Sequence, residues 1–264
     1  MTELFRFKEQ FCFILSMYQN LIKPFWADIK TFVLDTLFPK FCLGCGTEGG
    51  FLCLDCQAGL KPAKSQNCIA CKKPAAFGLT HPGCQTPFGA DGLVSFFDYR
   101  DDEKVANTLI KGKYSFLPEV YEILGGLIAQ KIRIDPAFSY LTSYITNSIL
   151  IPIPLHSSRR RWRGFNQAEI LCHSLAKQLG LPVVNALIRK KSTKTQKDLK
   201  KEERLRNIQD AFTISPNFQA FNFKSTNVIL VDDVTTTGAT LREAAKVLKR
   251  QGIAQVICLA AARD

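Results

Sequence analysis

The chain has 264 residues, of which 46% are hydrophobic and 22% are charged, and its net charge is +12. This composition is typical of a folded globular protein and excludes fibrous, low-complexity and largely disordered chains. The longest apolar run near the start, Phe11 to Tyr18, is far shorter than the roughly 20 residues of a membrane span, and no secretory cleavage site follows it. We therefore expect a cytoplasmic protein with no transmembrane segment.

Residues 1–41 are predicted to form a helical amino-terminal extension. Phe25, Ile29, Val33 and Leu37 recur every four residues, which places them on one face of a helix. Such an apolar stripe commonly packs on the body of the protein or on a partner, and we favour this interpretation. The alternative is a helix that lies on a membrane surface.

A cysteine-rich module is predicted over residues 42–90. Most of the ten cysteines occur as CxxC pairs, and in one further pair histidine stands in place of the first cysteine. Two thiolates at this spacing bind one metal ion from a tight turn, and two such turns complete the tetrahedral geometry of a structural zinc site. The predicted metal ligands, enough for two zinc ions, are Cys42, Cys45, Cys53, Cys56, Cys68, Cys71, His81 and Cys84.

The pairing of these ligands is open between two arrangements. In sequential pairing, which we favour, neighbouring pairs share a metal and form two small ribbons, whereas interleaved pairing gives a cross-braced module. His81 is the weakest predicted ligand, because a histidine beside a proline is often an ordinary loop residue, but its spacing completes a site with only three cysteines. The isolated Cys12, Cys172 and Cys258 have apolar neighbours and are predicted core residues.

Residues 91–264 are predicted to form an α/β domain. Near-continuous apolar strands alternate with amphipathic helices, a pattern typical of a parallel sheet covered by helices on both faces. We expect strands in the segments GLVSFFDY, SILIPIPL, NVILVDDV and AQVICLAAA, and helices in DEKVANTLIKG, EVYEILGGLIAQKI, FNQAEILCHSLAKQLG and TLREAAKVLKRQG.

The run VILVDDVTTTGAT, residues 228–240, is the most informative part of the sequence. Four apolar residues predict a buried strand, which is followed by two aspartates, a loop of threonines and glycine, and a helix. Ligands of parallel sheets bind at this edge, where loop N–H groups, hydroxyls and a helix N-terminus attract phosphate. Carboxylates just before such a loop accept hydrogen bonds from sugar hydroxyls, so the spacing predicts a ribose 5-phosphate site. The alternatives are a magnesium site on the aspartates and an ordinary helix start.

The whole run closely resembles the phosphoribosyl-pyrophosphate (PRPP) motif of type I phosphoribosyltransferases, whose fold is a parallel sheet flanked by helices with a variable hood. By that resemblance, Asp232 and Asp233 bind the ribose hydroxyls and the following loop holds the 5-phosphate. The implied PRPP-binding residues are Asp232, Asp233, Thr235, Thr236, Thr237, Gly238, Ala239 and Thr240.

Positive charge is concentrated in residues 156–207, which hold 14 Lys/Arg and only 4 Asp/Glu. A stretch this basic suits phosphate groups, and its first part, after SILIPIPL, is predicted to be a second loop that holds pyrophosphate. Arginine fits this role because its forked donors match phosphate oxygens. The predicted residues of this loop are His156, Arg159, Arg160, Arg161 and Arg163. A nucleic-acid surface is the rival interpretation, and one surface could serve both.

Four further segments, together with the PRPP motif, narrow the resemblance to the ComF family of competence-associated proteins. Members of this family have an N-terminal double zinc ribbon and a phosphoribosyltransferase domain. The segments are LFPKFCLGCG, FFDYRDDEKVANTLIKGKY, RGFNQAEIL and TQKDLKKEERLRNIQDAF. The resemblance covers the chain from about residue 35 to the end and departs at His81, where the family typically has cysteine.

The resemblance also implies a lid and a metal cofactor. In related enzymes a mobile segment ahead of the PRPP strand closes over the substrate, and the implied lid residues here are Gln196, Lys197, Arg204 and Asn207. Lys111 and Lys113 could face the same cleft, and Asn166 and Gln167 match the family's arginine loop. Magnesium would bridge the pyrophosphate and ribose oxygens of PRPP. The sequence offers no evident base and no nucleobase pocket, so catalytic residues and acceptor are not assigned.

Three functions are compatible with these observations. The first is a ComF-type factor that binds PRPP and serves DNA uptake, handling single-stranded DNA and meeting other competence proteins. The second is a phosphoribosyltransferase of nucleobase salvage. The third is a non-catalytic protein that uses the same site to bind PRPP or a partner. The zinc module favours the first, because salvage enzymes of this fold do not usually need one.

Overall fold

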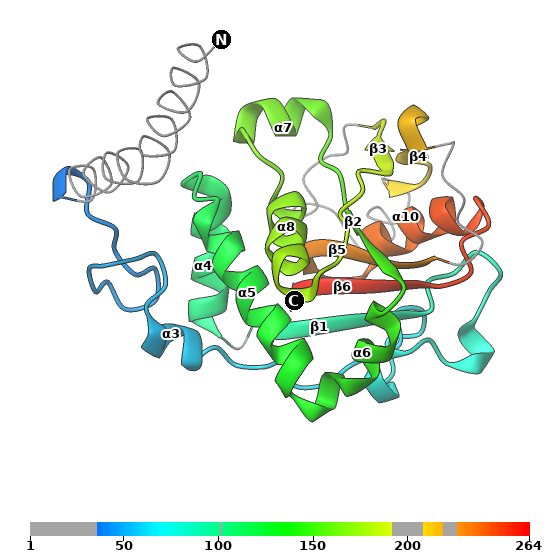
Figure 1. The fold of residues 1–264 in the computed structure, drawn as a ribbon, viewed down its shortest axis with the longest axis horizontal. Helices are drawn as coiled ribbons and strands as arrows, with labels where there is room; N and C mark the ends of the chain where they lie inside the picture. Colours follow the sequence, from blue (N-terminus) through cyan, green and yellow to red (C-terminus); the bar gives the residue numbers. More distant parts are fainter. Residues whose placement is uncertain (1–35, 101, 192–207, 219–225) are drawn as a thin grey trace, which may run out of the picture. The chain divides into compact units, whose positions relative to one another are not determined.

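A sheet of four parallel strands organises the domain that follows the cysteine-rich module (Figure 1). The computed structural model describes residues 36–100, 102–191, 208–218 and 226–264. Contacts define two units, residues 1–42 with 46–51 and residues 43–45 with 52–264. The predicted amino-terminal helix, apart from its last residues, and the predicted lid residues lie outside the described residues.

The larger unit alternates strands and helices as the sequence predicts. The predicted strands are β1 (Gly92–Asp98), β2 (Ser148–Pro152), β5 (Asn227–Thr235) and β6 (Val256–Arg263). The predicted helices are α4 (Glu103–Tyr114), α5 (Glu119–Ile134), α8 (Gln167–Leu179) and α10 (Ala239–Lys249). Elements that the sequence analysis did not predict are α3 (Leu54–Ala58), α6 (Ser139–Ile145), α7 (Ser157–Arg163), β3 (Leu187–Arg189) and β4 (Phe212–Ile214).

The strands of the main sheet lie in the order β1-β6-β5-β2, and every pair is parallel. In this register Asp232 of β5 lies opposite Ala260 of β6, and Val231 lies opposite Pro152 of β2. Strands β3 and β4 form a separate antiparallel pair. Because all four strands of the main sheet run the same way, the segments that follow β2 and β5 leave the sheet at the same edge.

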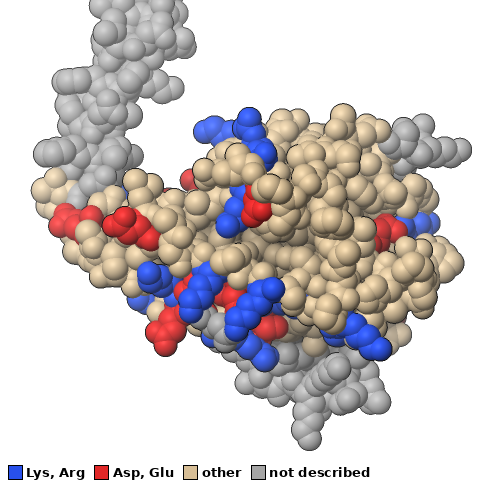
Figure 2. Space-filling view, turned by 90° about the horizontal axis from the view of Figure 1, so that it is seen from below, with Lys and Arg blue, Asp and Glu red and all other residues tan. Residues whose placement is uncertain are grey.

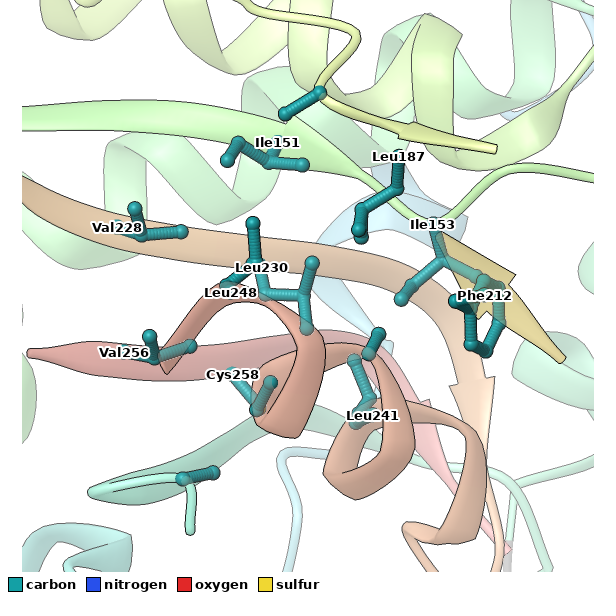
Figure 3. Close-up of a cluster of buried hydrophobic side chains, with 14 of the residues drawn as sticks. Ile151, Ile153, Leu187, Phe212, Val228, Leu230, Leu241, Leu248, Val256 and Cys258 are labelled. Carbon is teal, nitrogen blue, oxygen red and sulfur yellow. The ribbon is translucent and has the colours of Figure 1, made fainter. Parts of the chain in front are cut away.

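The main core lies between the sheet and α10 (Figure 3). Val228 and Leu230 of β5 project toward Leu241 and Leu248 of α10, and all four are fully buried. Helix α10 is amphipathic, with its buried residues spaced three or four apart. Cys258 lies in this core and Cys172 is buried on α8, which confirms two of the three predicted core cysteines. Cys12 lies outside the described residues.

The other face of the sheet is covered by α5 and α6, while α8 packs on α5, β2 and β5 (Figure 1). Close approach of α5 and α8 depends on Gly125, because a Cβ atom there would lie 2.5 Å from Cβ of Ser174. Helix α4 begins at Asp102, whose carboxylate accepts hydrogen bonds from the backbone N–H groups of Lys104 and Val105. Helix α8 ends at Gly180, whose left-handed conformation (φ 70°) is typical of helix C-caps.

Candidate functional site

A cleft of about 290 Å³ opens at the carboxyl edge of the sheet. It brings together the end of β5, the start of α10 and the segment that follows β2, which are far apart in the sequence. Ten of the residues that line it are Lys113, Arg159, Arg163, Asn166, Gln167, Arg189, Asp232, Asp233, Thr236 and Thr240. The sequence predicts three groups of ligand-binding residues: the aspartate pair, the arginines after β2 and the threonine loop. The cleft contains both aspartates and some residues of each of the other two groups.

The two aspartates differ in their surroundings. Oδ2 of Asp233 lies 2.6 Å from Nζ of Lys113, and its Oδ1 accepts a hydrogen bond from the N–H of Val234 at 2.7 Å. Asp232 Oδ1 accepts from the N–H of Asp233 at 2.9 Å. Burial, and then the charge of Asp233, raise the pKa of Asp232 to about 7. Asp232 thus gains affinity for a cation or for hydroxyl donors as pH rises through neutrality.

The threonine loop connects β5 to α10 through Gly238, whose φ of 67° is left-handed. Thr236 and Thr240 of the predicted phosphate-binding run line the cleft. The other predicted residues are not among those that line the cleft: Thr235 at the end of β5, Thr237 and Gly238 in the loop, and Ala239 at the start of α10. The amino end of α10 faces this loop, and unpaired N–H groups at a helix start favour an anion.

The predicted pyrophosphate loop is in fact the short helix α7. His156 starts it, with Nδ1 accepting from the N–H of Ser158 at 3.3 Å, and Gly164 ends it in a left-handed conformation. The helix separates its arginines: Arg159 and Arg163 line the cleft, whereas Arg160 pairs with Glu169 at 2.9 Å. Arg161 is exposed, and His156 is not among the cleft residues. Hence the loop assignment was wrong, and only two of the five predicted residues reach the cleft.

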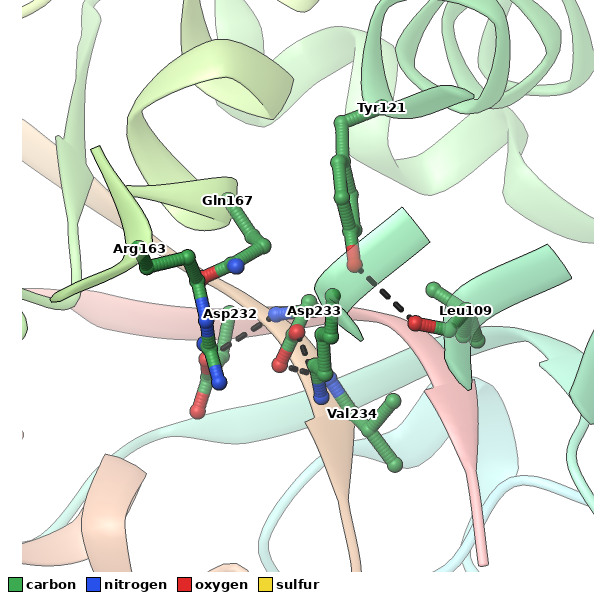
Figure 4. Close-up of polar contacts among 8 residues, drawn as sticks. Leu109, Tyr121, Arg163, Gln167, Asp232, Asp233 and Val234 are labelled. Carbon is green, nitrogen blue, oxygen red and sulfur yellow. Dashed lines mark hydrogen bonds and ion pairs between the residues drawn. The ribbon is translucent and has the colours of Figure 1, made fainter. Parts of the chain in front are cut away.

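Two buried donors lie at the arginine side of the cleft (Figure 4). Arg163 donates from Nη1 to Oε1 of Gln167 at 3.0 Å, which orients both side chains. Within the described part of the chain, Nε of Arg163 and Nε2 of Gln167 are buried and have no hydrogen-bond partner. Buried donors of this kind are rarely left unsatisfied, so the site suits a ligand with acceptor oxygens.

Tyr99, Arg189 and Asp264 also line the cleft and were not predicted. Tyr99 follows β1 and Asp264 follows β6, so a signal existed: both come directly after a strand of the parallel sheet, at the edge where ligands bind. Arg189 lies at the end of β3, a strand of three residues that gives no periodic pattern. Burial lowers the pKa of Arg189 to about 10, which leaves it charged at neutral pH beside Asp232.

Two metal-binding groups occur in the cysteine-rich module, each with its ligand atoms within 4.8 Å of one another. Both are sequential: the first combines Cys42, Cys45, Cys53 and Cys56, and the second combines Cys68, Cys71, His81 and Cys84. Four S and N donors at this separation suit tetrahedral zinc.

His81 is oriented as a metal ligand. Its Nδ1 lies 3.3 Å from Sγ of Cys71, and its Nε2 lies 3.0 Å from the carbonyl oxygen of Pro74. A histidine that binds a metal through one ring nitrogen typically has such a contact at the other, which fixes the orientation of its ring. Although burial opposes it, hydrogen bonds from backbone groups of Cys71 and His81 lower the pKa of the Cys68 thiol to about 6. A thiolate is therefore available to a cation at neutral pH.

Charge on the surface is mixed rather than uniformly basic. On the face drawn in Figure 2, lysines and arginines gather together with aspartates and glutamates. Within the described part of the basic stretch, residues 156–191 hold eight Lys/Arg and one Asp/Glu.

Among the residues that the structure describes, no helix combines the length and apolarity needed to cross a bilayer.

Comparison with known families finds two matching models. A double zinc ribbon domain matches residues 33–85, and a phosphoribosyl transferase domain matches residues 166–264. The first match contains both metal-binding groups, and the second contains the aspartate pair, the threonine loop, Gln167 and Arg189. The parallel sheet flanked by helices is thus the sheet of a phosphoribosyltransferase domain.

Similar proteins of known name cover most of the chain. DNA utilization protein YhgH of Salmonella typhimurium is 31% identical over 79% of this chain and 89% of its own length. Competence protein ComFC of Bacillus subtilis is 32% identical over 76% of this chain and 79% of its own length. Competence protein F of Haemophilus influenzae is 37% identical over 40% of this chain, and the match spans 46% of that protein.

Proposed function

The chain belongs to the ComF family, and we propose on that basis that its cleft binds PRPP. Asp232 and Asp233 would accept the ribose hydroxyls, the loop from Thr235 to Thr240 would hold the 5-phosphate, and Arg159 and Arg163 would meet the pyrophosphate. Magnesium fits the same place, because carboxylate and phosphate oxygens are its preferred ligands.

The observation that carries this proposal is the division of charge within one cleft. The aspartates of β5 form an acidic side, and Arg159, Arg163 and Gln167 form a side of donors. The buried Nε of Arg163 and Nε2 of Gln167 have no partner among the described residues, and a pyrophosphate oxygen would satisfy them. PRPP carries hydroxyls, a pyrophosphate and a 5-phosphate on its ribose. Its hydroxyls would match the acidic side of the cleft, and its phosphates would match the side of donors.

The chemistry of transfer is a separate question from binding. Bound magnesium would supply charge neutralisation on departing pyrophosphate, and the two cleft arginines would hold that group in place. Among the described residues that line the cleft there is no histidine to activate an acceptor. Transfer of phosphoribose to an acceptor is therefore proposed only as the enzymatic form of this function, with a nucleobase as the salvage alternative and non-catalytic binding as the other.

Calorimetric titration of magnesium and PRPP tests the binding site. We expect saturable binding by the wild-type protein and its loss in an Asp232→Asn, Asp233→Asn double variant. Glu122→Gln, an exposed acid on α5 outside the cleft, is the matched control and should bind as the wild type does. Equal binding by the double variant, or no binding by zinc-loaded wild type, would reject the assignment. Release of pyrophosphate with a panel of bases would separate salvage catalysis from binding alone.

A second candidate function, contact with single-stranded DNA, is favoured by an aromatic group near the cleft. Tyr114, Phe116 and Trp162 are 47%, 46% and 58% exposed. The ring of Trp162 lies 6.4 Å from that of Tyr114 and 5.5 Å from that of Phe116. The guanidinium of Arg163 lies 5.8 Å from the Trp162 ring. Exposed rings beside arginines resemble the stacking surfaces of single-strand binders.

The three rings form an aromatic platform, which consists of Tyr114, Phe116 and Trp162. Bases would stack on it while Arg159 to Arg163 contact phosphates, and the names of the relatives, DNA utilization protein and competence protein, agree with a role in DNA uptake. Other competence proteins are the partners this role would bring. The cytoplasm is the proposed compartment, because it keeps thiols reduced, as cysteines that bind zinc must be.

Binding of labelled oligonucleotides measures this role. Trp162→Ala should weaken binding of single-stranded DNA by about tenfold, since stacking contributes about 1–3 kcal/mol per base. Phe88→Ala is a matched control, because Phe88 is 48% exposed and also has an arginine over its ring, at 5.7 Å from Arg250. Affinity should also fall with salt, by about 0.7 log units per log unit of salt for each phosphate contacted. Salt-insensitive binding would exclude the phosphate contacts, and equal loss in both variants would exclude the platform.

A further inference from the structure

The second metal-binding group lies directly against the loop that follows β5. Lys72, next to the ligand Cys71, donates from Nζ to the carbonyl oxygen of Thr237 at 2.5 Å and to that of Ile69 at 2.5 Å. Ile69 is 2% exposed and belongs to the main core. Lys72 thus connects the turn that contains the ligands Cys68 and Cys71 with the threonine loop. Lys72 and Thr237 are 165 residues apart in the sequence.

The loop packs closely against this turn at Gly238. A Cβ atom on Gly238 would lie 3.2 Å from Cγ1 of Ile69 and 3.5 Å from Nζ of Lys72. The backbone of the loop therefore touches the turn, and Gly238 is required both for this close approach and for its φ of 67°.

The direction of the Thr237 carbonyl fixes the direction of the next N–H. The Thr237–Gly238 peptide unit is trans, and in a trans unit the C=O and the N–H point in opposite directions. Because Lys72 holds the Thr237 carbonyl toward the metal-binding turn, the Gly238 N–H points away from that turn. A donor fixed in advance binds an anion more tightly than one that must reorient, because less conformational freedom is lost on binding.

The turn that carries Lys72 is itself defined by the metal ligands. Lys72 has a left-handed φ of 69°, its N–H donates to the carbonyl oxygen of Cys68 at 3.0 Å, and the N–H of Cys68 donates to that of Lys73 at 3.0 Å. Binding of one ion by Cys68 and Cys71 would hold both ends of this turn. The metal group and Lys72 therefore share one small structural unit.

We propose that Lys72 is a positioning residue through which the second metal-binding group sets the conformation of the phosphate loop, so that filling this group with zinc controls affinity for the phosphate end of the ligand. This role rests on the proposed PRPP site for its consequence but not for its geometry.

Hydrogen–deuterium exchange followed by mass spectrometry tests the contact without any ligand. In the zinc-loaded full chain, Lys72→Met should raise exchange in the peptide covering residues 231–242, because the Thr237 carbonyl loses its donor. Lys73→Met, at an exposed neighbouring position, should leave that peptide as in the wild type. His81→Ala should raise exchange in the same peptide, since it weakens the metal group without touching Lys72. Unchanged exchange in Lys72→Met overturns the positioning role, and unchanged exchange in His81→Ala overturns the control by zinc.

Titration with ribose 5-phosphate and magnesium tests the consequence. We expect binding by Lys72→Met to be about tenfold weaker than by the wild type, as for loss of a hydrogen bond to a charged group, and binding by Lys73→Met to be unchanged. If the wild type binds no ribose 5-phosphate while exchange responds as expected, the PRPP site fails and the contact between ribbon and loop stands. If the wild type binds and Lys72→Met binds equally well, the control of affinity fails and the PRPP site stands.

Discussion

Nζ of Lys113 lies 2.6 Å from Oδ2 of Asp233, so one of the two carboxylates proposed to hold ribose hydroxyls is paired with a cation before any ligand enters. The two side chains are only 23% and 12% exposed, so this pair is shielded from salt more than a surface pair would be. Burial and the charge of Asp233 raise the pKa of Asp232, and the charge of Lys113 lowers it by a smaller amount.

Lys113→Met is expected to shift the pH dependence of ligand binding upward. Without the ammonium group, whose charge lowers the pKa of Asp232, that carboxyl holds its proton more tightly, so the pH at which binding of magnesium and ribose 5-phosphate is half-maximal should rise. Calorimetry across pH 5.5 to 8.5 would measure this midpoint, with about one sample per half pH unit. Lys111→Met is the control, because Lys111 is exposed and does not line the cleft. Equal midpoints in the two variants would contradict a role for the ion pair.

The raised pKa of Asp232 also predicts how stability depends on pH. The folded protein holds this proton up to about pH 7, whereas the unfolded chain releases it near its ordinary value of about 4. The folded state therefore binds more protons in between, and the free energy of unfolding falls as pH rises through this range. Asp232→Asn should raise the melting temperature at pH 8 and have little effect at pH 4. A difference that is the same at both pH values would show that another group is responsible.

Metal analysis of two His81 variants tests the second metal-binding group. His81→Cys should keep two zinc ions per chain, because a thiolate replaces the Nδ1 donor and completes four sulfur ligands. His81→Ala should keep one firmly bound ion and melt at a lower temperature, since three ligands hold zinc more weakly. Two firmly bound ions in His81→Ala would show that His81 is an ordinary loop residue.

The contact between α5 and α8 can be tested with neighbouring glycines. Gly125→Ala should destabilise the fold by about 1–3 kcal/mol, because overpacking forces a shift at a Cβ position that lies 2.5 Å from Cβ of Ser174. Gly126→Ala meets only the end of Gln178, at 3.1 Å, and should be neutral or stabilise the helix by up to about 1 kcal/mol. Denaturant unfolding of the two variants would measure the difference. Equal effects would mean that α8 can move aside.

The sequence was sufficient for the main sheet and its helices, because long apolar runs and periodic stripes carry the information on them. It was also sufficient for both metal groups, whose ligands are close in sequence. The predicted loop over four arginines is wrong, because His156 starts the helix α7 there and Gly164 ends it. Tyr99 and Asp264 were not predicted, although both come directly after a strand of the parallel sheet, and Arg189 of β3 was not predicted either. Short strands such as β3 have too few residues for a recognisable period.

Arg163 takes part in two surfaces at once, since it is bound to Gln167 inside the cleft and lies 5.8 Å from the ring of Trp162 outside it. An anion that draws the guanidinium inward would change the cation–π contact, and a base stacked on Trp162 would change the guanidinium available to the anion. Thermodynamic linkage requires the two effects to be equal in free energy, whatever their sign. Through this one side chain, binding of an anion in the cleft would change the affinity for a nucleic acid stacked on Trp162, and binding of the nucleic acid would change the affinity for the anion.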